Sequence, residues 1–365
     1  MTDSMKLRQT PLYRAHAVAG ARIVDFAGWA MPVLYSSILD EARAVRSSVG
    51  IFDISHMGRT HMSGPGATAL LQRLTSNDVE TLSPSEAQYS LLTNPHGGII
   101  DDIIVYRKST DSYLVVINAS NTEKDLTWIR QHAGSDVSIE DKTEETAMIA
   151  VQGPAAPAMV AELAGDPALL SLKRFQYGRG RIAQAEATFC RTGYTGEDGF
   201  ELILPAAGAI EVWRRLMDAG AVQCGLGARD ALRIEAGYPL YGHEIDDETS
   251  PVEAGLMWVV QIAKGDFTGS DAIRAMKEQG AKRRLVGLTS PERQQGRQGY
   301  SIYAEDKVVG TVTSGVFSPT RNQSIAMGYV AAPYAKPGTQ VEIAIRDKRI
   351  KASVCAKKSL LEQLP

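Results

Sequence analysis

The fold of this chain is constrained most by one stretch, Gly97-Gly-Ile-Ile-Asp-Asp-Ile-Ile-Val-Tyr106. Its β-rich residues are built for burial, yet two neighbouring acids, Asp101 and Asp102, stand in its middle. Because side chains alternate faces along a strand, the two acids must point in opposite directions and do not form a dyad that shares one proton. The stretch alone leaves two interpretations equally open: one acid faces a functional site, or both bind backbone amides of the turn at Gly97-Gly98.

Strands and helices alternate on both sides of this stretch. Tyr113–Asn118 follows it across the polar turn Lys108–Asp111, which predicts a hairpin. Ser120 or Asn121 is then placed to cap a helix over Glu123–His132. The dipeptide Gly-Pro precedes a helical run at 64–65 and again at 153–154, which indicates a duplicated unit of strand and helix. The same patterns predict further strands at Met57–Ser63, Ala147–Val151, Ile182–Cys190 and Phe200–Leu204, and helices at Ala67–Leu74, Ala155–Ala164, Ala209–Ala219 and Ala228–Glu235.

The residue pattern changes near residue 283, where an α+β body ends and helical patterns no longer recur. Short β-rich runs then recur between turns, which predicts a small all-β domain. We therefore expect residues 1–283 to form the body and residues 284–365 the last domain, with the charged stretch Lys277–Arg284 as linker. The β-rich runs are Leu285–Leu288, Gly299–Tyr303, Val308–Thr313, Ala326–Val330, Gln340–Ile345 and Ile350–Val354.

Composition and charge exclude several classes of protein. With 365 residues, of which 44% are hydrophobic and 22% charged, the chain is longer than one core usually supports, so two or three domains are expected. The net charge of −3 comes from interspersed acids and bases, which argues against a nucleic-acid partner. Cys190, Cys224 and Cys355 are widely spaced, and the histidines show no metal-ligand spacing, so we expect neither a disulfide framework nor a metal site.

The sequence carries no signal for export or membrane insertion. No apolar run approaches the length of a membrane span. Met1–Gln9 is polar and short, without the apolar core of a secretory signal or the amphipathic length of a transit peptide. A bacterial cytoplasmic location, without a membrane partner, is the expectation that follows.

Two further segments carry candidate binding residues. The first, Arg191-Thr-Gly-Tyr-Thr-Gly-Glu-Asp-Gly-Phe-Glu201, has glycines that let the backbone pass close to a ligand. It matches no phosphate-binding fingerprint, and taken alone it is more simply a flexible acidic turn. The second, Gly225–Tyr238, is a glycine turn that feeds a short helix with Arg229 near its N-terminal end. An arginine there opposes the helix dipole, so it should pair with Asp230, the commoner outcome, or bind an anionic ligand.

Taken together, these segments resemble the glycine cleavage T-protein family, the folate-dependent aminomethyltransferases, along nearly the whole chain. An ordered series of motifs is far more specific than any one of them. Besides the Gly97–Tyr106 stretch, the series contains Thr10–Tyr13, Val24–Pro32, Glu41–Arg46, Val49–Met57, Thr75–Asp78, Ile149–Pro154, Arg191–Glu201, Gly225–Gly237 and Thr313–Thr320.

The resemblance implies a fold and an activity. Members of the family fold into three domains, with folate in a central cavity and a barrel-like domain at the C-terminus; residues 1–283 would then hold two interleaved α+β domains. The implied reaction moves the methylene carbon of an aminomethyl group on the lipoyl arm of H-protein to tetrahydrofolate. Its products are 5,10-methylenetetrahydrofolate, ammonia and dihydrolipoyl H-protein. Tetrahydrofolate is thus the co-substrate, no metal is implied, and lipoylated H-protein is the partner, with the decarboxylase and dihydrolipoyl dehydrogenase of glycine cleavage involved indirectly.

The same resemblance places the catalytic carboxylate at Asp102. A glutamate carboxylate can accept the amino group and the ring N–H of a pterin together, and tyrosines supply apolar faces with a polar tip. We expect Asp102 to hydrogen-bond the folate so that N5 is aimed at the aminomethyl carbon, where positive charge develops as ammonia leaves. The implied folate contacts are Tyr89, Asn118, Tyr194, Glu201, Arg229 and Tyr238.

The chain departs from the family pattern near its C-terminus. Arg321-Asn322 stands where members of the family usually have Leu-Gly, and the tail Ala356–Pro365 lacks their aromatic-proline motif, so no tail contact is implied. Arg293 and Arg297, at the start of the last domain, are candidates for touching an acidic lipoyl carrier, although a solvated basic loop explains them more simply.

Three other functions compete with the aminomethyltransferase. The folate-binding iron–sulfur maintenance protein carries Cys-Tyr-x-Gly-Gln-Glu, whereas this chain has Gly193–Glu197 without a cysteine. A demethylase of the dimethylglycine type is normally fused to a flavin domain with a GxGxxG motif, which this sequence lacks. A non-catalytic folate-binding scaffold is the alternative that only turnover separates from the enzyme.

Overall fold

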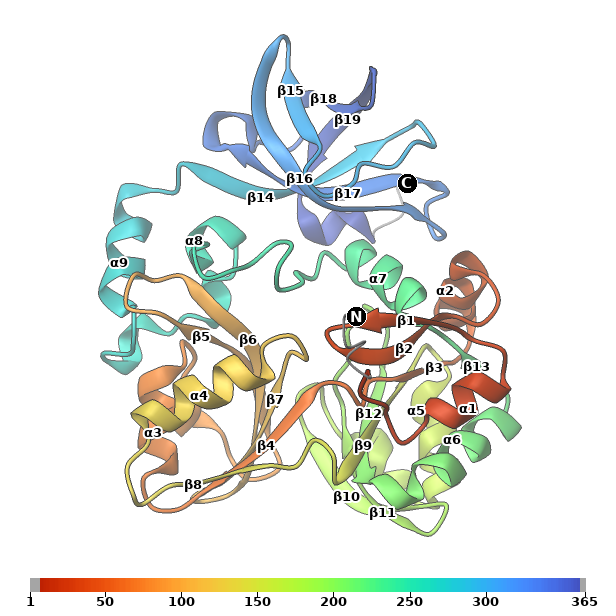
Figure 1. The fold of residues 1–365 in the computed structure, drawn as a ribbon. Helices are drawn as coiled ribbons and strands as arrows, with labels where there is room; N and C mark the ends of the chain where they lie inside the picture. The colour runs from red at the N-terminus through yellow and green to blue at the C-terminus, as the bar shows by residue number, and fades with distance from the viewer. Residues whose placement is uncertain (1–6, 362–365) are drawn as a thin grey trace, which may run out of the picture.

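The computed structural model describes residues 7–361 of the chain. Residues 1–6, which carry most of the polar stretch Met1–Gln9, and residues 362–365 at the end of the tail lie outside the described part. Three lobes surround a common centre (Figure 1). Two sheets with their helices stand next to each other, and a barrel lies across them at the top of that view.

The first sheet carries the stretch with the two neighbouring acids. Its elements are β4 (Gly58–Ser63), α3 (Ala67–Leu74), β5 (Ala87–Thr93), β6 (Ile99–Ser109), β7 (Ser112–Ile117), α4 (Thr122–His132) and β8 (Ser138–Asp141), with strand order β5-β6-β7-β4-β8. The predicted hairpin is confirmed as the antiparallel pair β6 and β7. Along β6, Ile103 and Val105 pack with residues of α3 and α4, whereas Asp102 and Ile104 on the other face reach a cavity.

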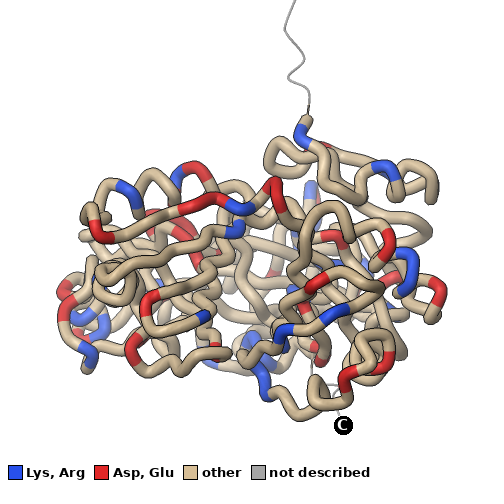
Figure 2. Tube along the Cα trace, turned by 90° about the horizontal axis from the view of Figure 1, so that it is seen from below, with Lys and Arg blue, Asp and Glu red and all other residues tan. Residues whose placement is uncertain are grey.

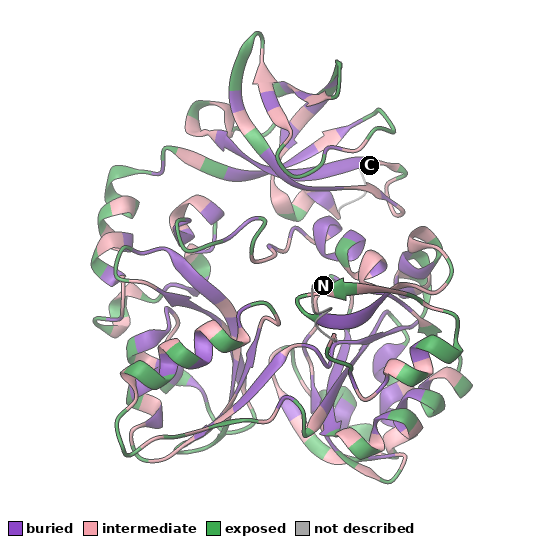
Figure 3. Cartoon of the chain, in the orientation of Figure 1, coloured by how far each residue is buried: buried purple, intermediate pink, exposed green. Residues whose placement is uncertain are grey.

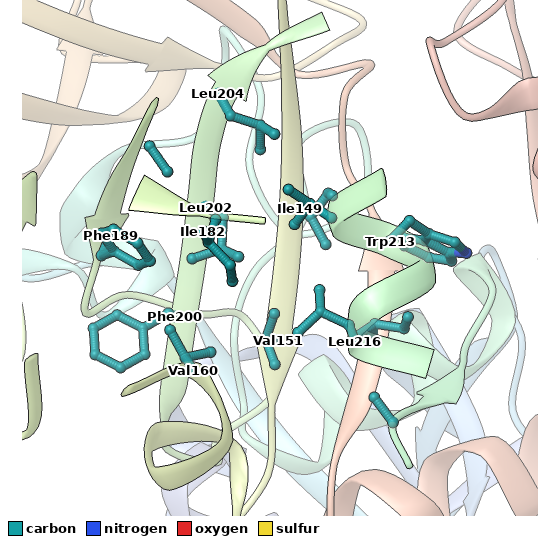
Figure 4. Packing of buried hydrophobic residues seen from close by; sticks show 14 of the residues in the cluster. Ile149, Val151, Val160, Ile182, Phe189, Phe200, Leu202, Leu204, Trp213 and Leu216 are labelled. Atoms are coloured by element: carbon teal, nitrogen blue, oxygen red, sulfur yellow. The ribbon is translucent and has the colours of Figure 1, made fainter. Parts of the chain in front are cut away.

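The second sheet has the order β10-β11-β12-β9-β3-β13. Its elements are β3 (Gly50–Asp53), β9 (Thr146–Gln152), β10 (Tyr177–Ile182), β11 (Ala185–Cys190), β12 (Gly199–Pro205) and β13 (Val222–Gln223), with helices α1 (Tyr13–Val18), α5 (Ala156–Ala164) and α6 (Ala209–Asp218). Figure 4 shows the core between sheet and helices, where Ile149 and Val151 of β9 lie beside Trp213 and Leu216 of α6. This packing fixes the sheet whose β12 carries Glu201.

One predicted strand of this sheet starts too early. The run Ile182–Cys190 contains a turn at Ala183 and Gln184, whose φ angles are 47° and 66°, so Ile182 ends β10 and only Ala185–Cys190 forms the predicted strand, β11. Two-residue hairpin turns with positive φ are usually marked by asparagine or glycine. Neither residue occupies this turn, so no residue pattern marked it.

Both sheets use the same connection, as the repeated Gly-Pro dipeptide predicts. β4 leads through Gly64-Pro65 into α3, and β9 leads through Gly153-Pro154 into α5. The φ angle is 119° at Gly64 and 133° at Gly153, a region that other residues rarely enter. Equivalent units of strand, glycine turn and helix therefore stand in the two sheets.

The predicted all-β domain is confirmed as a closed barrel in the order β14-β17-β16-β15-β18-β19. Its strands are β14 (Arg283–Ser290), β15 (Ser301–Ala304), β16 (Lys307–Ser318), β17 (Gln323–Ala331), β18 (Gln340–Ile345) and β19 (Lys348–Cys355). Closure leaves no free sheet edge in this domain. The expected linker is shorter than predicted, because α9 (Ser270–Gln279) extends into it and only residues 280–282 separate this helix from β14.

Helix α7 (Leu226–Glu235) connects the body with the barrel. Its Glu235 accepts hydrogen bonds from the backbone N–H and the hydroxyl of Thr320, at 3.1 and 3.0 Å. Its Arg233 donates to Ser314 Oγ at 2.6 Å. Arg46 of α2 (Ile38–Ser47) donates to Glu235 at 2.7 Å, so three parts of the chain meet at one carboxylate.

The remaining elements lie around these lobes. They are β1 (Arg22–Phe26) paired with β2 (Trp29–Leu34), helix α8 (Pro251–Ala254), and short 3-10 turns at Val79–Thr81, Pro167–Ser171, Ala206–Gly208, Met257–Val259, Ile262–Lys264, Ala332–Tyr334 and Lys357–Leu360. Buried residues follow the strands, and exposed ones follow the outer sides of the helices (Figure 3). Basic and acidic residues are intermingled in Figure 2, in keeping with the net charge of −3. Within residues 7–361, no helix has both the length and the apolarity needed to cross a membrane.

Candidate active site

A cavity of about 790 Å³ lies where the two sheets, α7 and the C-terminal turn meet. Its lining includes residues of β6, β12 and α7, together with Lys357 and Lys358 of the turn that follows the barrel. Every residue that the sequence analysis assigned to catalysis or to folate lies on this lining: Tyr89, Asp102, Asn118, Tyr194, Glu201, Arg229 and Tyr238. The fold therefore brings together side chains that are up to 149 residues apart in the sequence, from Tyr89 to Tyr238.

On one side Asp102 is held by two neighbours, and we call Tyr89, Asp102 and Asn118 the carboxylate wall. Tyr89 Oη donates to Asp102 Oδ2 at 2.9 Å, and Asn118 Nδ2 donates to Asp102 Oδ1 at 2.7 Å. Burial first, and then the charge of Asp101, raise the pKa of Asp102 to about 7, although the two hydrogen bonds lower it. A carboxyl group with this pKa changes charge near neutral pH.

Asp101 points to the other side of the strand, as the alternation predicts, and is fully buried. It accepts hydrogen bonds from Asn118 N at 3.1 Å, Asn118 Nδ2 at 2.9 Å and Asn121 Nδ2 at 2.6 Å. The interpretation that both acids bind the turn at Gly97-Gly98 is therefore wrong; Asn94 Oδ1 accepts from Gly98 N there. Asn121 is the residue before α4, as predicted, but its side chain makes no cap bond; its Nδ2 donates to Asp101.

The opposite side of the cavity is formed by Tyr194, Glu201 and Arg229, which we call the arginine wall. Glu201 is buried on β12, and Thr192 Oγ1 donates to its Oε2. Burial raises the pKa of Glu201, while Thr192 and the charge of Arg229 lower it. The guanidinium of Arg229 lies 4.7 Å from the ring centroid of Tyr194, within the range of a cation–π contact.

Arg229 does not form the ion pair with Asp230 that the sequence favoured. Asp230 instead accepts from Arg233 Nε at 2.8 Å, one turn further along α7, and Arg233 also donates to Glu244 at 2.7 Å. Arg229 Nη1 is buried and donates to no partner among residues 7–361. The other expectation, an anionic ligand for Arg229, stays a prediction, and the carboxylate of Glu201 supplies negative charge near this arginine.

Two tyrosines cover the cavity near α7. The rings of Tyr194 and Tyr238 stack, with centroids 5.8 Å apart, and Tyr194 Oη donates to the carbonyl of Pro239. Tyr238 Oη accepts from Arg174 Nη2 at 2.9 Å. The glycine-rich segment around Tyr194 is anchored, since Thr195 Oγ1 donates to Gln152 Oε1 at 2.9 Å, and its predicted flexibility as a simple turn does not fit these contacts.

Two cavity residues were missed because no motif around them marks a binding site. His56 follows a fully buried strand; burial lowers its pKa to about 3, and its Nδ1 has no partner in the described part of the chain. Trp258 is 63% exposed and stacks on Tyr89 with centroids 5.6 Å apart. The sequence assigned His56 and Trp258 no site role, yet both line the cavity.

The C-terminal turn also contributes to the cavity, although the sequence implied no tail contact. Lys357 Nζ donates to Ala254 O at 2.6 Å, and Lys357 and Lys358 lie on the lining. Burial lowers the pKa of Lys357 to about 8, while the charge of Glu244 raises it. Arg293 lies against the ring of Phe317 at 5.5 Å, on an exposed loop of the barrel.

Comparison with known proteins gives this arrangement a family. Residues 12–264 match the family model of the GCVT N-terminal domain, and residues 283–359 match that of the glycine cleavage T-protein C-terminal barrel domain. A crystal structure of glycine cleavage system aminomethyltransferase T from Bartonella henselae superposes with a TM-score of 0.92 at 35% identity, covering 98% of this chain and 99% of that one.

Curated relatives agree along their full length. An aminomethyltransferase of Desulforamulus reducens is 44% identical over 356 residues, covering 96% of this chain and 98% of the relative. An aminomethyltransferase of Bacillus subtilis is 42% identical over 354 residues, covering 95% of this chain and 98% of the relative. With both family models matched and relatives of this identity covered from end to end, the chain belongs to the aminomethyltransferase family, the T-proteins of the glycine cleavage system.

Proposed function

We propose that this chain transfers the methylene carbon of an aminomethyl group, carried on the lipoyl arm of H-protein, to tetrahydrofolate. The C–N bond to the amino group breaks and ammonia leaves, and the C–S bond to the arm breaks to give the dihydrolipoyl form. The carbon ends between N5 and N10 of the folate, which lose their two N–H protons, one balanced by the ammonia and one by the sulfur of the arm. Family membership supports the reaction class. The observation that carries it is the carboxylate Asp102, fixed by Tyr89 and Asn118 at the cavity surface.

The chemistry of the cavity fits a reduced folate. Its volume of about 790 Å³ is in the range of small-molecule sites. Glu201 presents a carboxylate to the cavity with one oxygen held by Thr192, which suits the adjacent amino and ring N–H donors of a pterin. Arg229 Nη1, unpartnered among the described residues, supplies a donor for a ring carbonyl. The apolar faces of Tyr194 and Tyr89 suit the flat rings.

In this proposal Asp102 orients the reacting nitrogen and stabilises charge. Ionised Asp102 accepts a hydrogen bond from the folate and favours the positive charge that develops on the one-carbon unit as ammonia leaves. Tyr89 and Asn118 hold the carboxylate in one orientation, so little reorganisation is needed during the transfer. Tyr238 and Arg174, joined by a hydrogen bond, border the same cavity and contact the rest of the folate.

The partner in this proposal is lipoylated H-protein, and the other components of glycine cleavage act on H-protein rather than on this chain. Arg293 and Arg297 are exposed basic side chains suited to an acidic carrier surface. The proposed working division of the chain is a folate-binding body at 1–283 and a barrel at 284–365, operating in a bacterial cytoplasm.

The test is turnover by an Asp102→Asn variant with tetrahydrofolate and aminomethylated H-protein, following ammonia and methylenetetrahydrofolate together. We expect kcat to fall by at least about 100-fold because the amide carries no charge. Tetrahydrofolate binding, measured by calorimetry, should stay within about threefold because the shape is unchanged. Asp111→Asn, in the exposed turn of the same hairpin, is the matched control and should match the parent.

Two outcomes would count against the proposal. Full activity in Asp102→Asn would remove Asp102 from the reaction. Tetrahydrofolate binding by the unaltered chain, without release of either product, would favour the non-catalytic scaffold instead.

A further inference from the structure

A second buried acid lies behind the carboxylate wall. Asp125 of α4 is 0% exposed, and no donor group within residues 7–361 reaches either of its carboxyl oxygens. The group that faces it within hydrogen-bonding reach is the carboxyl of Asp101, itself fully buried. Two carboxyl groups in contact away from water cannot both be ionised without a large cost.

The charged groups around the pair only partly offset a second negative charge, and Lys124 is the one that lowers the pKa of Asp125. From β6, Asp102 adds negative charge on the cavity side. Lys124 precedes Asp125 on α4, but its Nζ donates to Ile100 O at 2.8 Å and to Tyr241 Oη at 2.6 Å, and lies 3.6 Å from Asp247. The cation is thus shared among other acceptors, and a proton between the two carboxyl groups is the remaining way to relieve their repulsion.

The hydrogen bonds decide which of the two acids holds the proton. Asp101 accepts from Asn118 N, Asn118 Nδ2 and Asn121 Nδ2, all of which favour its ionised form. Asp125 accepts from no donor in the described part of the chain. Burial first, and then the charge of Asp101, raise the pKa of Asp125 to about 11.

We propose that Asp125 is a neutral carboxylic acid that donates its proton to ionised Asp101, and that this pair positions Asn118 and thereby Asp102. The chain of contacts runs from Asp125 through Asp101 to the Asn118 amide, which donates to Asp101 and Asp102 at 2.9 and 2.7 Å. The proton also limits the negative charge behind Asp102, which allows Asp102 to ionise near neutral pH. Asp125 is a positioning residue, and its role rests on the proposed function of Asp102.

The first test is spectroscopic and independent of turnover. At pH 8, the infrared difference spectrum between the parent chain and Asp125→Asn should contain one C=O stretch of a protonated carboxyl group, with a shift in D₂O. The same comparison made in an Asp102→Asn background should show the same band. Absence of the band from both comparisons would overturn the neutral acid.

The second test compares two substitutions at the same position. Asp125→Asn keeps a donor toward Asp101 without a charge, so kcat should stay within about threefold of the parent. Asp125→Ala removes the donor, and kcat should fall about tenfold or more because Asp101, which anchors Asn118, is no longer held in place. Equal losses in both variants would overturn the positioning role, and thermal melts establish that each variant is folded.

The two proposals fail in different ways. Should Asp102→Asn remain fully active, the assigned role of Asp102 fails, while the infrared band still reports on the proton of Asp125. Should Asp102→Asn be inactive and the band be missing, the proposal for Asp125 fails and that for Asp102 stands.

Discussion

The two walls of the cavity differ in whether their polar groups already have hydrogen-bond partners in the protein. In the carboxylate wall, both oxygens of Asp102 already accept hydrogen bonds from protein groups, Tyr89 and Asn118. In the arginine wall, Arg229 Nη1 is buried without a partner among residues 7–361, and His56 Nδ1 beside it is unpartnered as well. Buried polar groups normally have hydrogen-bond partners. The contrast indicates that the protein itself holds Asp102 in place, whereas a ligand would supply the partner of Arg229.

After Asp102 itself, the largest effect should come from a change in the carboxylate wall at Asn118. Asn118→Ala removes the amide that joins Asp101 to Asp102. Asp102 then loses its fixed orientation, and no amide donates to both carboxylates. We expect kcat to fall by about 100-fold, measured as coupled release of ammonia and methylenetetrahydrofolate. Asn322→Gly, at an exposed barrel turn with a φ of 52°, is the control and should leave kcat unchanged. A loss confined to KM would show that Asn118 only binds the folate.

The arginine wall should respond mainly in affinity. Glu201→Gln replaces an acceptor pair by one acceptor and one donor, which mismatches the two donors of a pterin. We expect the Kd for tetrahydrofolate to rise by roughly 10- to 100-fold by calorimetry, with a smaller change in kcat. Glu186→Gln, exposed on the neighbouring strand β11, serves as control. An unchanged Kd in Glu201→Gln would show that the folate does not use this carboxylate.

A change of pH should alter kcat, which depends on the carboxylate wall, more than it alters the affinity for tetrahydrofolate. The pKa of Asp102 is raised to about 7, so the ionised form that the reaction needs is lost as pH falls through that value. We expect kcat to fall about tenfold for each pH unit below 7, while the Kd for tetrahydrofolate changes far less between pH 6 and 8. A flat kcat profile from pH 5.5 to 8 would be incompatible with an ionised Asp102 in the transfer step.

The smallest effect concerns stability. Because the pKa of Asp102 rises on folding from 3.8 to about 7, the folded state binds a proton more tightly than the unfolded state. Stability from this proton is present at acidic pH and is lost as pH rises through about 7. Asp102→Asn removes the ionisation, so it should gain unfolding free energy in urea melts at pH 8, and less at pH 5. A gain of the same size at both pH values would point to packing rather than charge.

The sequence predicted the architecture well where pattern alone decides it. Alternating β-rich runs gave the barrel strands, and the Gly-Pro dipeptides marked equivalent turns in both sheets. The alternation along β6 correctly separated Asp101 from Asp102. The hairpin at Ala183 and Gln184 was missed, because its turn residues are not those that usually tolerate positive φ.

The site was harder, because its contacts join residues from different elements. The assignment of these residues to one site came from the family resemblance, since no local pattern distinguishes Tyr89 or Glu201. The pairing of Arg229 with Asp230 was wrong, as Arg233 competes for Asp230 from one turn away. His56 matters because the fold places it on the cavity, and Asp125 because the fold places it against Asp101; propensity and spacing encode neither position.

The placement of Lys357 and Lys358 on the cavity lining has a consequence for folding during synthesis. Domains emerge from the ribosome in order, and the N-terminal parts fold first. Here the two sheets can form while the barrel is still being made, but the cavity is completed only when the turn at Lys357–Leu360 packs back beneath α7. A nascent chain therefore lacks the finished cavity until synthesis has passed the turn at Lys357–Leu360.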